Sequence, residues 1–253
     1  MHTPHLNPDN THNPYLSEEV SSAQHANPGF MSKGIHWVPA TSTLGSFQEE
    51  RRWIVTYRRL ARATDARTMI AAIGPFAGYE MNANNILMPP EASSASHCCL
   101  IANLNCIPFD YVVRQKLQGT TLNWYIVEQL PVIAPTDYDR AFGATTARDL
   151  VRHHVLRLTY TAHDMAPFAR DLGYHGPPFI WNQEKRRHLR ARLDALYFHL
   201  YGLSKDDAAY ILDTFPIVRR QDKAAFGSYR TKNMVLAYYN ALAAGDTNTD
   251  VAL

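Results

Sequence analysis

The sequence has few cysteines, no long apolar run and no glycine-rich nucleotide loop. Its three Cys, with Cys98 and Cys99 adjacent, exclude a disulfide framework. Residues 1–32 contain no Lys or Arg and no apolar stretch, which argues against a secretory signal. No run reaches the roughly 18 apolar residues of a membrane span. Together these absences predict a cytoplasmic protein with reduced thiols and no membrane partner.

Several catalytic signatures are also missing. No Gly-x-Gly occurs, which excludes the dinucleotide fingerprint and the cofactor loop of class I methyltransferases. The chain has no P-loop motif and no Gly-x-Ser-x-Gly nucleophile elbow. The only Cys-His cluster, residues 97–99 with Cys106, falls on an apolar helical segment, so core packing is its expected role. We therefore predict no catalytic residue and no metal ligand in this chain.

The composition is that of a globular chain. Its 253 residues are 46% hydrophobic and 19% charged, and the formal net charge is +2. Because positive and negative charges nearly balance, the net charge neither demands nor excludes a polyanionic partner. The positions of the arginines are therefore the more informative evidence for such a partner.

The hydrophobic pattern predicts an α+β fold: a small mixed sheet with packed helices, followed by a mainly helical C-terminal region. Period-2 alternation predicts a half-buried strand beginning near Trp53, a returning strand over 68–73 that stops at Gly74, and a third strand over 121–127. Helical spacing predicts helices over 92–117 (kinked or ended by Pro108), 161–172 (with a Thr161–Asp164 capping box), 184–200, a short one from 204 that ends before Pro216, and 231–244.

Three regions follow from this pattern. Residues 1–34, rich in Asn, Pro, His and Ser, predict an irregular N-terminal arm; residues 35–140 form the α+β part and residues 141–253 the helical part. The arm carries His2, His5, His12 and His25. Either they form a metal-binding tract or they belong to a polar leader, and the spacing matches no known ligand pattern.

Arginine is concentrated before residue 68. Six arginines lie between 51 and 67, where Asp65 is the sole acid, and aromatic residues are interleaved with them. Arginine suits bidentate contacts with phosphate and guanine, but an edge strand can also carry charge simply to resist aggregation. Two interpretations are also open for the cluster of Arg114, Lys116 and Gln118 at the end of a predicted helix. The cations can complement the dipole of the helix C-terminus, or the cluster can face nucleic-acid phosphates.

Three blocks of the sequence resemble one protein family. They are YRRLARATDARTMIAAIGP (57–75), FDYVVRQKLQGTTLN with EQLPV (109–123 and 128–132), and LDALYFHLYGL, YILDTFP and FGSYRTK between 193 and 232. In this order they resemble the C-terminal region of large adenine-specific DNA methylases of restriction-modification and phage-defence systems, namely type IIG enzymes and their relatives. The resemblance covers about residues 36–244.

The resemblance implies a DNA-binding specificity module with a target-recognition-like domain over 35–140. In such enzymes an upstream domain binds S-adenosylmethionine and flips the adenine, so the resemblance implies that this cofactor belongs to an upstream or partner methyltransferase domain. Here Gly176-Pro177-Pro178-Phe179 lacks the Asn, Ser or Asp that opens an adenine-binding Asn-Pro-Pro-Tyr loop, and Asn13-Pro14-Tyr15 lacks the second Pro. Methyltransferase activity of this chain alone is therefore left open.

The expected partners are double-stranded DNA and a methyltransferase catalytic domain or subunit. Tyr57 and Trp124 are expected to stack on DNA or to pack internally. Two alternatives remain: a module that docks onto a methylase without binding DNA, and a stand-alone enzyme that uses His and acidic residues. The residues expected to contact DNA are Arg58, Arg59, Arg62, Arg67, Arg114, Lys116 and Asn123.

Overall fold

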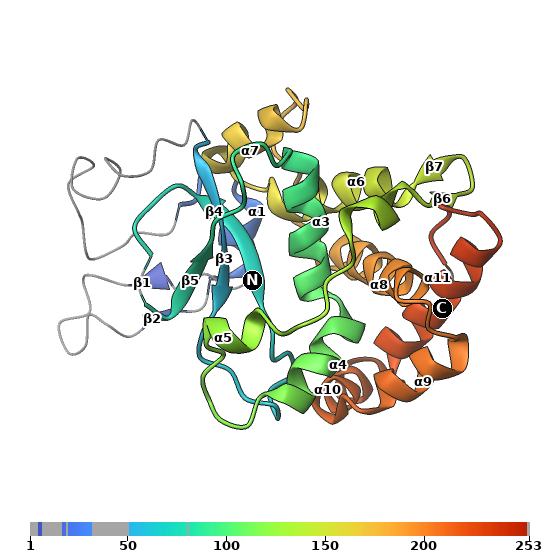
Figure 1. Cartoon of the computed structure of the whole chain (residues 1–253). Helices are drawn as coiled ribbons and strands as arrows, with labels where there is room; N and C mark the ends of the chain where they lie inside the picture. Colours follow the sequence, from blue (N-terminus) through green and yellow to red (C-terminus); the bar gives the residue numbers. More distant parts are fainter. Residues whose placement is uncertain (1–4, 7–16, 19, 32–50, 80, 252–253) are drawn as a thin grey trace.

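The computed structural model describes residues 5–6, 17–18, 20–31, 51–79 and 81–251. It confirms the predicted α+β class: a three-stranded sheet lies at one side of the molecule and the C-terminal helices at the other (Figure 1). None of the helices in these ranges is both long enough and apolar enough to cross a membrane.

The sheet is antiparallel throughout, with β3 (Trp53–Arg58) between β4 (Ala71–Pro75) and β5 (Ala83–Ile86). Val55 at its centre pairs with Ile73 on one side and Ile86 on the other. The predicted half-burial of β3 is wrong, because Ile54 and Thr56, on the face expected to be open, are only 7% and 6% exposed. Both faces of β3 are therefore covered, as happens where a sheet is packed on both sides.

The predicted break at Pro108 is confirmed. Helix α3 (Ser94–Asn105) ends at Cys106, and α4 (Ile107–Lys116) begins at once with proline in its first turn, where its missing N–H costs no hydrogen bond. The strand predicted over 121–127 is wrong: only Thr121 makes a β-bridge, to Leu60, and α5 (Trp124–Val127) follows. Aromatic and β-branched side chains raised the strand propensity of that short segment, but tertiary packing decided its conformation.

The C-terminal region is helical as predicted. It contains α6 (Ala147–Thr159), α7 (Ala166–Asp171), α8 (Gln183–Leu200), α9 (Lys205–Asp213), α10 (Pro216–Phe226) and α11 (Arg230–Ala243). The Thr161–Asp164 capping box is wrong, because a 3-10 turn (His163–Met165) with no side-chain cap precedes α7. A second 3-10 turn (Pro135–Asp139) and the strand pair β6 (Ala141–Phe142) and β7 (Thr145–Thr146) lead into α6.

One hydrophobic core joins the sheet to the helices. Helix α3 contacts both β4 and α6, α4 contacts α8 and α9, and α8 packs along α11. Trp53 lies at this junction: its ring meets Phe168 edge-on at 5.2 Å, and its Nε1 donates to Asp171 at 2.7 Å. Buried residues on both sides of the expected boundary at 140/141 therefore belong to the same cluster.

The described part of the N-terminal arm contains short regular elements. Strand β1 (His5–Leu6) pairs with β2 (Ser17–Glu18), and α1 (Ser22–Ala26) begins with a Ser21–Gln24 capping box. The ring of His25 stacks on Trp181 at 4.2 Å, and the backbone N–H of His163 donates to the carbonyl of Pro28. Much of the expected arm, with His2 and His12, lies outside the described residues.

Candidate nucleic-acid interface

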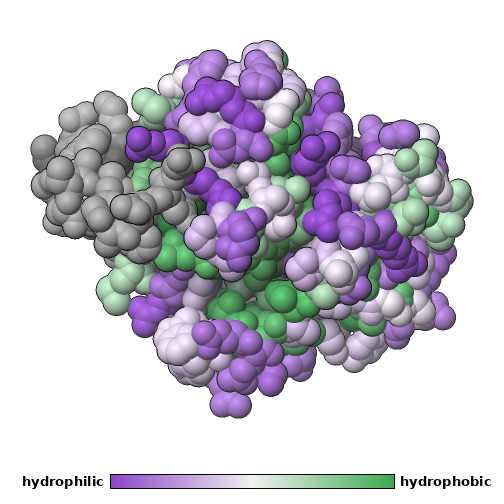
Figure 2. Space-filling model, turned by 45° about the horizontal axis from the view of Figure 1, so that its top comes forward, coloured by the Kyte–Doolittle hydropathy of each residue, from purple (hydrophilic) through white to green (hydrophobic). Residues whose placement is uncertain are grey.

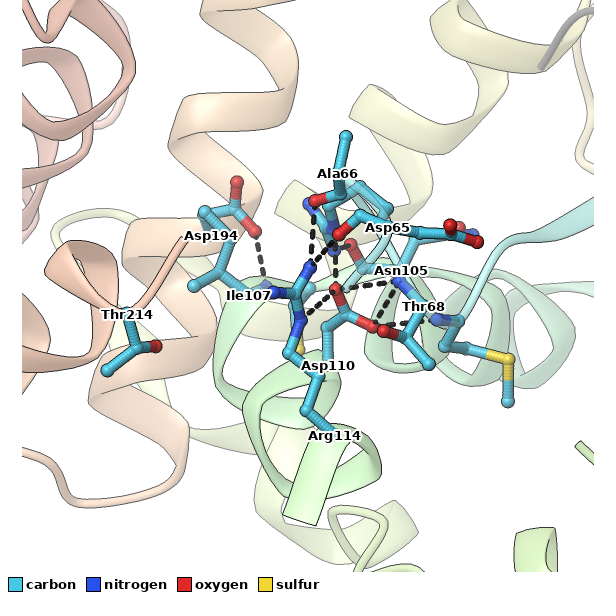
Figure 3. Close-up of polar contacts among 12 residues, drawn as sticks. Asp65, Ala66, Thr68, Asn105, Ile107, Asp110, Arg114, Asp194 and Thr214 are labelled. Atoms are coloured by element: carbon cyan, nitrogen blue, oxygen red, sulfur yellow. Dashed lines mark hydrogen bonds and ion pairs between the residues drawn. The ribbon is translucent and has the colours of Figure 1, made fainter. Parts of the chain in front are cut away.

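A buried polar cluster centres on Asp110 (Figure 3). Its carboxylate is fully buried and accepts hydrogen bonds from the backbone N–H groups of Thr68, at 3.0 and 3.2 Å, and Met69, at 2.7 Å. Arg67 donates through Nε at 3.1 Å, and Arg114 lies 3.6 Å away. Asp110 stands in the first turn of α4, where negative charge complements the helix dipole. It therefore joins the chain preceding β4 to α4.

Arg114 completes this cluster from the next turn of α4. Its guanidinium donates to the carbonyls of Asp65 at 2.6 Å and Ala66 at 2.9 Å, and it lies over the ring of Phe215. The side chain is 9% exposed, and burial lowers its pKa from the ordinary arginine value. Arg114 is thus committed to holding the turn 62–67 against α4.

Two residues predicted to contact DNA make internal contacts instead of standing free at the surface. The guanidinium groups of Arg67 and Arg114 are used inside the molecule, where they neutralise Asp110 and bind backbone carbonyls. Burial acts to lower the pKa of Arg67, but the carboxylates of Asp110 and Asp194 outweigh this effect and raise it. Arg58 is more open, yet it pairs with Asp65 at 3.1 Å and donates to the carbonyl of Arg67.

Asp194 of α8 adds a second buried carboxylate. Its Oδ1 accepts a hydrogen bond of 2.8 Å from the backbone N–H of Ile107, the first residue of α4. The N-cap residue of α4, Cys106, makes no capping hydrogen bond with its side chain. Burial raises the pKa of Asp194 to about 6, against the opposing charge of Arg67. This bond ties the helical region to α4.

Beside the cluster, two distant segments meet at the surface. The N–H of Ala61 donates to the carbonyl of Thr120 at 3.1 Å, and the N–H of Leu122 donates to the carbonyl of Arg59 at 2.7 Å. Residues 59–61 therefore lie against residues 120–122. We call the polar and exposed side chains along these two joined segments the basic–aromatic surface; it comprises Arg59, Leu60, Arg62, Lys116, Asn123, Trp124 and Tyr125.

The aromatic residues of this surface are open to solvent. Trp124 is 64% exposed and Tyr125 52%, with Leu60 exposed nearby. Trp124 is thus placed where stacking is possible. Tyr57, by contrast, is buried, and its hydroxyl accepts from Asn84 at 2.9 Å, so it packs internally and does not stack on a ligand.

The cations of the basic–aromatic surface lack acidic partners. Within the described ranges, no carboxylate forms an ion pair with Arg59, Arg62 or Lys116. Arg59 instead donates through Nε to Oδ1 of Asn123 at 3.3 Å, which orients both side chains. Asp65, the nearest acid on this segment, is already bound to Arg58 and to the N–H of Arg62.

The residues that the structure describes offer few other candidate sites. The 174–179 loop is a packed aromatic structure in which Tyr174 stacks on Phe179 at 5.0 Å. Cys99 is buried, which raises its pKa to about 12 and makes it a poor nucleophile. In the part of the chain that the structure describes, no group of three or more His, Cys, Asp or Glu could hold a metal. On the face shown in Figure 2, hydrophobic residues gather near the middle and hydrophilic residues surround them.

In comparisons with known proteins, no protein-family model, curated protein or solved structure matched the chain. Any functional assignment therefore depends on the sequence motifs and on the geometry of the basic–aromatic surface.

Proposed function

We propose that this chain is the DNA-binding specificity module of an adenine-specific DNA methyltransferase from a restriction-modification or phage-defence system. Methyl transfer, and the binding of S-adenosylmethionine, would belong to a separate catalytic domain or subunit in the same cytoplasmic complex. The observation that carries this proposal is the basic–aromatic surface, where Arg59, Arg62 and Lys116 form no ion pair with any described carboxylate and Arg59 bonds Asn123, the residue before the exposed Trp124.

The chemistry of this surface suits a duplex. Arginine binds phosphate oxygens or the guanine edge through paired N–H donors, and lysine binds phosphate as a point charge. Arg59 and Asn123, held together by their hydrogen bond, present mainly N–H donors and so favour acceptor groups such as guanine O6 and N7. An exposed indole can stack on a base or cover a sugar.

The buried cluster gives this surface a fixed shape. Asp110, Arg67 and Arg114 hold the turn 62–67 on α4, and Lys116 is the last residue of that helix. A preorganised surface loses less conformational entropy when a ligand binds. The motif residues that are buried thus act as supports for those that are exposed.

Fluorescence anisotropy with a labelled duplex at several salt concentrations tests the proposal. The wild-type chain should bind at low salt, with an affinity that falls steeply as salt rises. The triple variant Arg59→Gln, Arg62→Gln, Lys116→Gln should lower the slope of log K against log salt by up to about 3, since each lost phosphate contact removes about 0.9. Absence of binding to any duplex, alone or with a methylase partner, would reject the proposal.

A docking function is the second candidate. Apolar side chains that are half exposed or more favour it, because such surfaces often serve protein contacts. In this case the chain would bind a methylase subunit with no affinity for DNA, and Trp124→Ala would weaken that complex. The large exposed hydrophobic residues near the sheet and α5 are Leu60, Met81, Leu87, Trp124, Tyr125 and Val132.

A further inference from the structure

A second group of cations lies on the C-terminal helices. Helix α10 has no buried residue, and its Arg219, Arg220 and Lys223 are exposed. The neighbouring helices α8 and α11 add further arginines. We call this group the helical basic surface; it comprises Arg187, Arg190, Arg219, Arg220, Lys223 and Arg230.

Contacts around Phe226 bring the three helices together. The guanidinium groups of Arg187 on α8 and Arg230 on α11 lie 4.7 and 4.8 Å from the centre of its ring. Arg219 and Lys223 precede Phe226 by seven and three residues, which places them on the same face of α10. Cations from three helices therefore line one surface.

The acids near this surface do not balance its charge. Glu184 alone serves both Arg187, at 3.1 Å, and Arg230. Asp222, the acid of α10, accepts from the N–H of Thr231 at the start of α11. Within the described residues, no carboxylate forms an ion pair with Arg190, Arg219, Arg220 or Lys223. The surface thus keeps a net positive charge.

The helical basic surface adjoins the turn that supports the basic–aromatic surface. Arg114 binds the carbonyls of Asp65 and Ala66 and also lies 4.0 Å from the ring of Phe215, the residue before α10. A rigid polyanion lying on the basic–aromatic surface could therefore continue across the turn onto α10.

We propose that the helical basic surface binds the phosphate backbone of the same DNA duplex that the basic–aromatic surface contacts. The helical region would then be part of the DNA interface, in addition to any role in docking. This inference rests on the proposed function. Its chemistry is sequence-independent: exposed arginine and lysine side chains neutralise phosphates and release counterions.

Two triple variants with equal charge change test it. The first is Arg219→Gln, Arg220→Gln, Lys223→Gln, all exposed on α10; glutamine keeps the helix propensity of these positions. The matched control is Arg152→Gln, Arg170→Gln, Lys205→Gln, all exposed on α6, α7 and α9. Because both sets remove three positive charges, a difference between them reports position and not net charge. Circular dichroism melting verifies that both remain folded.

In anisotropy titrations with a duplex of about 30 base pairs, the α10 variant should weaken binding by about tenfold or more near 0.1 M salt. It should also lower the salt slope by 2 to 3. The control variant should change affinity less than threefold. Equal effects of both triples, with the salt slope still lowered in the Arg59, Arg62, Lys116 variant, would overturn this inference alone. Failure of the wild-type chain to bind any duplex would overturn the proposed function as well.

Discussion

Replacing Asp110 should destabilise the fold more than any surface substitution. The carboxylate is fully buried and accepts from the backbone N–H groups of Thr68 and Met69, while Arg67 and Arg114 lie against it. Asp110→Ala leaves two backbone donors without acceptors and two guanidinium groups without their counter-charge.

The expected cost follows from these contacts. Breaking a buried ion pair by removing one partner costs about 3–5 kcal/mol, and each buried unsatisfied donor costs about 1–3 kcal/mol. These terms overlap, so we expect Asp110→Ala to lose about 4–5 kcal/mol of unfolding free energy. Asp110→Asn should lose about 2–3 kcal/mol, because its amide oxygen still accepts from Thr68 and Met69 while the charge is gone.

Urea unfolding followed by tryptophan fluorescence and circular dichroism measures this difference. The control is Asp137→Ala, an exposed acid of the 3-10 turn before α6, which should stay within about 0.5 kcal/mol of wild type. If Asp110→Ala costs less than about 1 kcal/mol, the carboxylate does not organise the turn 62–67, and the argument that the basic–aromatic surface is rigid is lost.

Three further outcomes are expected. Burial raises the pKa of Asp194 to about 6, so folding favours its protonated form and the free energy of unfolding falls as pH rises from about 4 through about 6. Urea unfolding across this range should show wild type losing about 3 kcal/mol more than Asp194→Asn. Equal pH profiles of the two proteins would contradict this. Selection from a random duplex library should show that Arg59→Ala relaxes a preference for guanine at one position. Lys116→Ala should weaken binding without changing the base preference. An unchanged consensus sequence in Arg59→Ala would mean that other residues contact the bases. Gly143→Ala should lower the melting temperature more than Gly173→Ala, because both glycines have positive φ but only at Gly143 would a Cβ collide with backbone; equal shifts would refute that contact.

Local pattern was enough for the elements with strong periodicity. The leucine spacing of α8 and the alternation of β3 identified both, and Pro108 marked the break between α3 and α4. Weak patterns failed. Strand β5, with Asn84 and Asn85 at its centre, has little strand propensity and exists because it pairs with β3.

Helix α10 was missed for a different reason. Proline at position 216 was interpreted as a stop signal, but in the first turn of a helix it starts a new one. The helix has no buried residue, and Val218 packs only partly against the core.

The candidate site was only partly predictable. The density of arginine between 51 and 67 pointed to the region that carries part of the basic–aromatic surface, but the sequence could not show which guanidinium groups face inward. Arg67 is committed to Asp110, 43 residues away, and Arg114 to carbonyls 48 and 49 residues away. The approach of 59–62 to 119–122, which exposes Trp124 beside Arg59, is likewise a long-range contact that no local pattern reveals.

The separation between supporting and exposed residues has a consequence for changing what such a protein recognises. Asp110, Arg67 and Arg114 make their bonds largely with one another and with backbone atoms, so the side chains at 59, 62 and 124 are not needed for those bonds. New chemistry can therefore be introduced at those outer positions while the scaffold beneath keeps its geometry. A library randomised there, on an otherwise intact chain, is the natural starting point for changing the ligand preference of this surface.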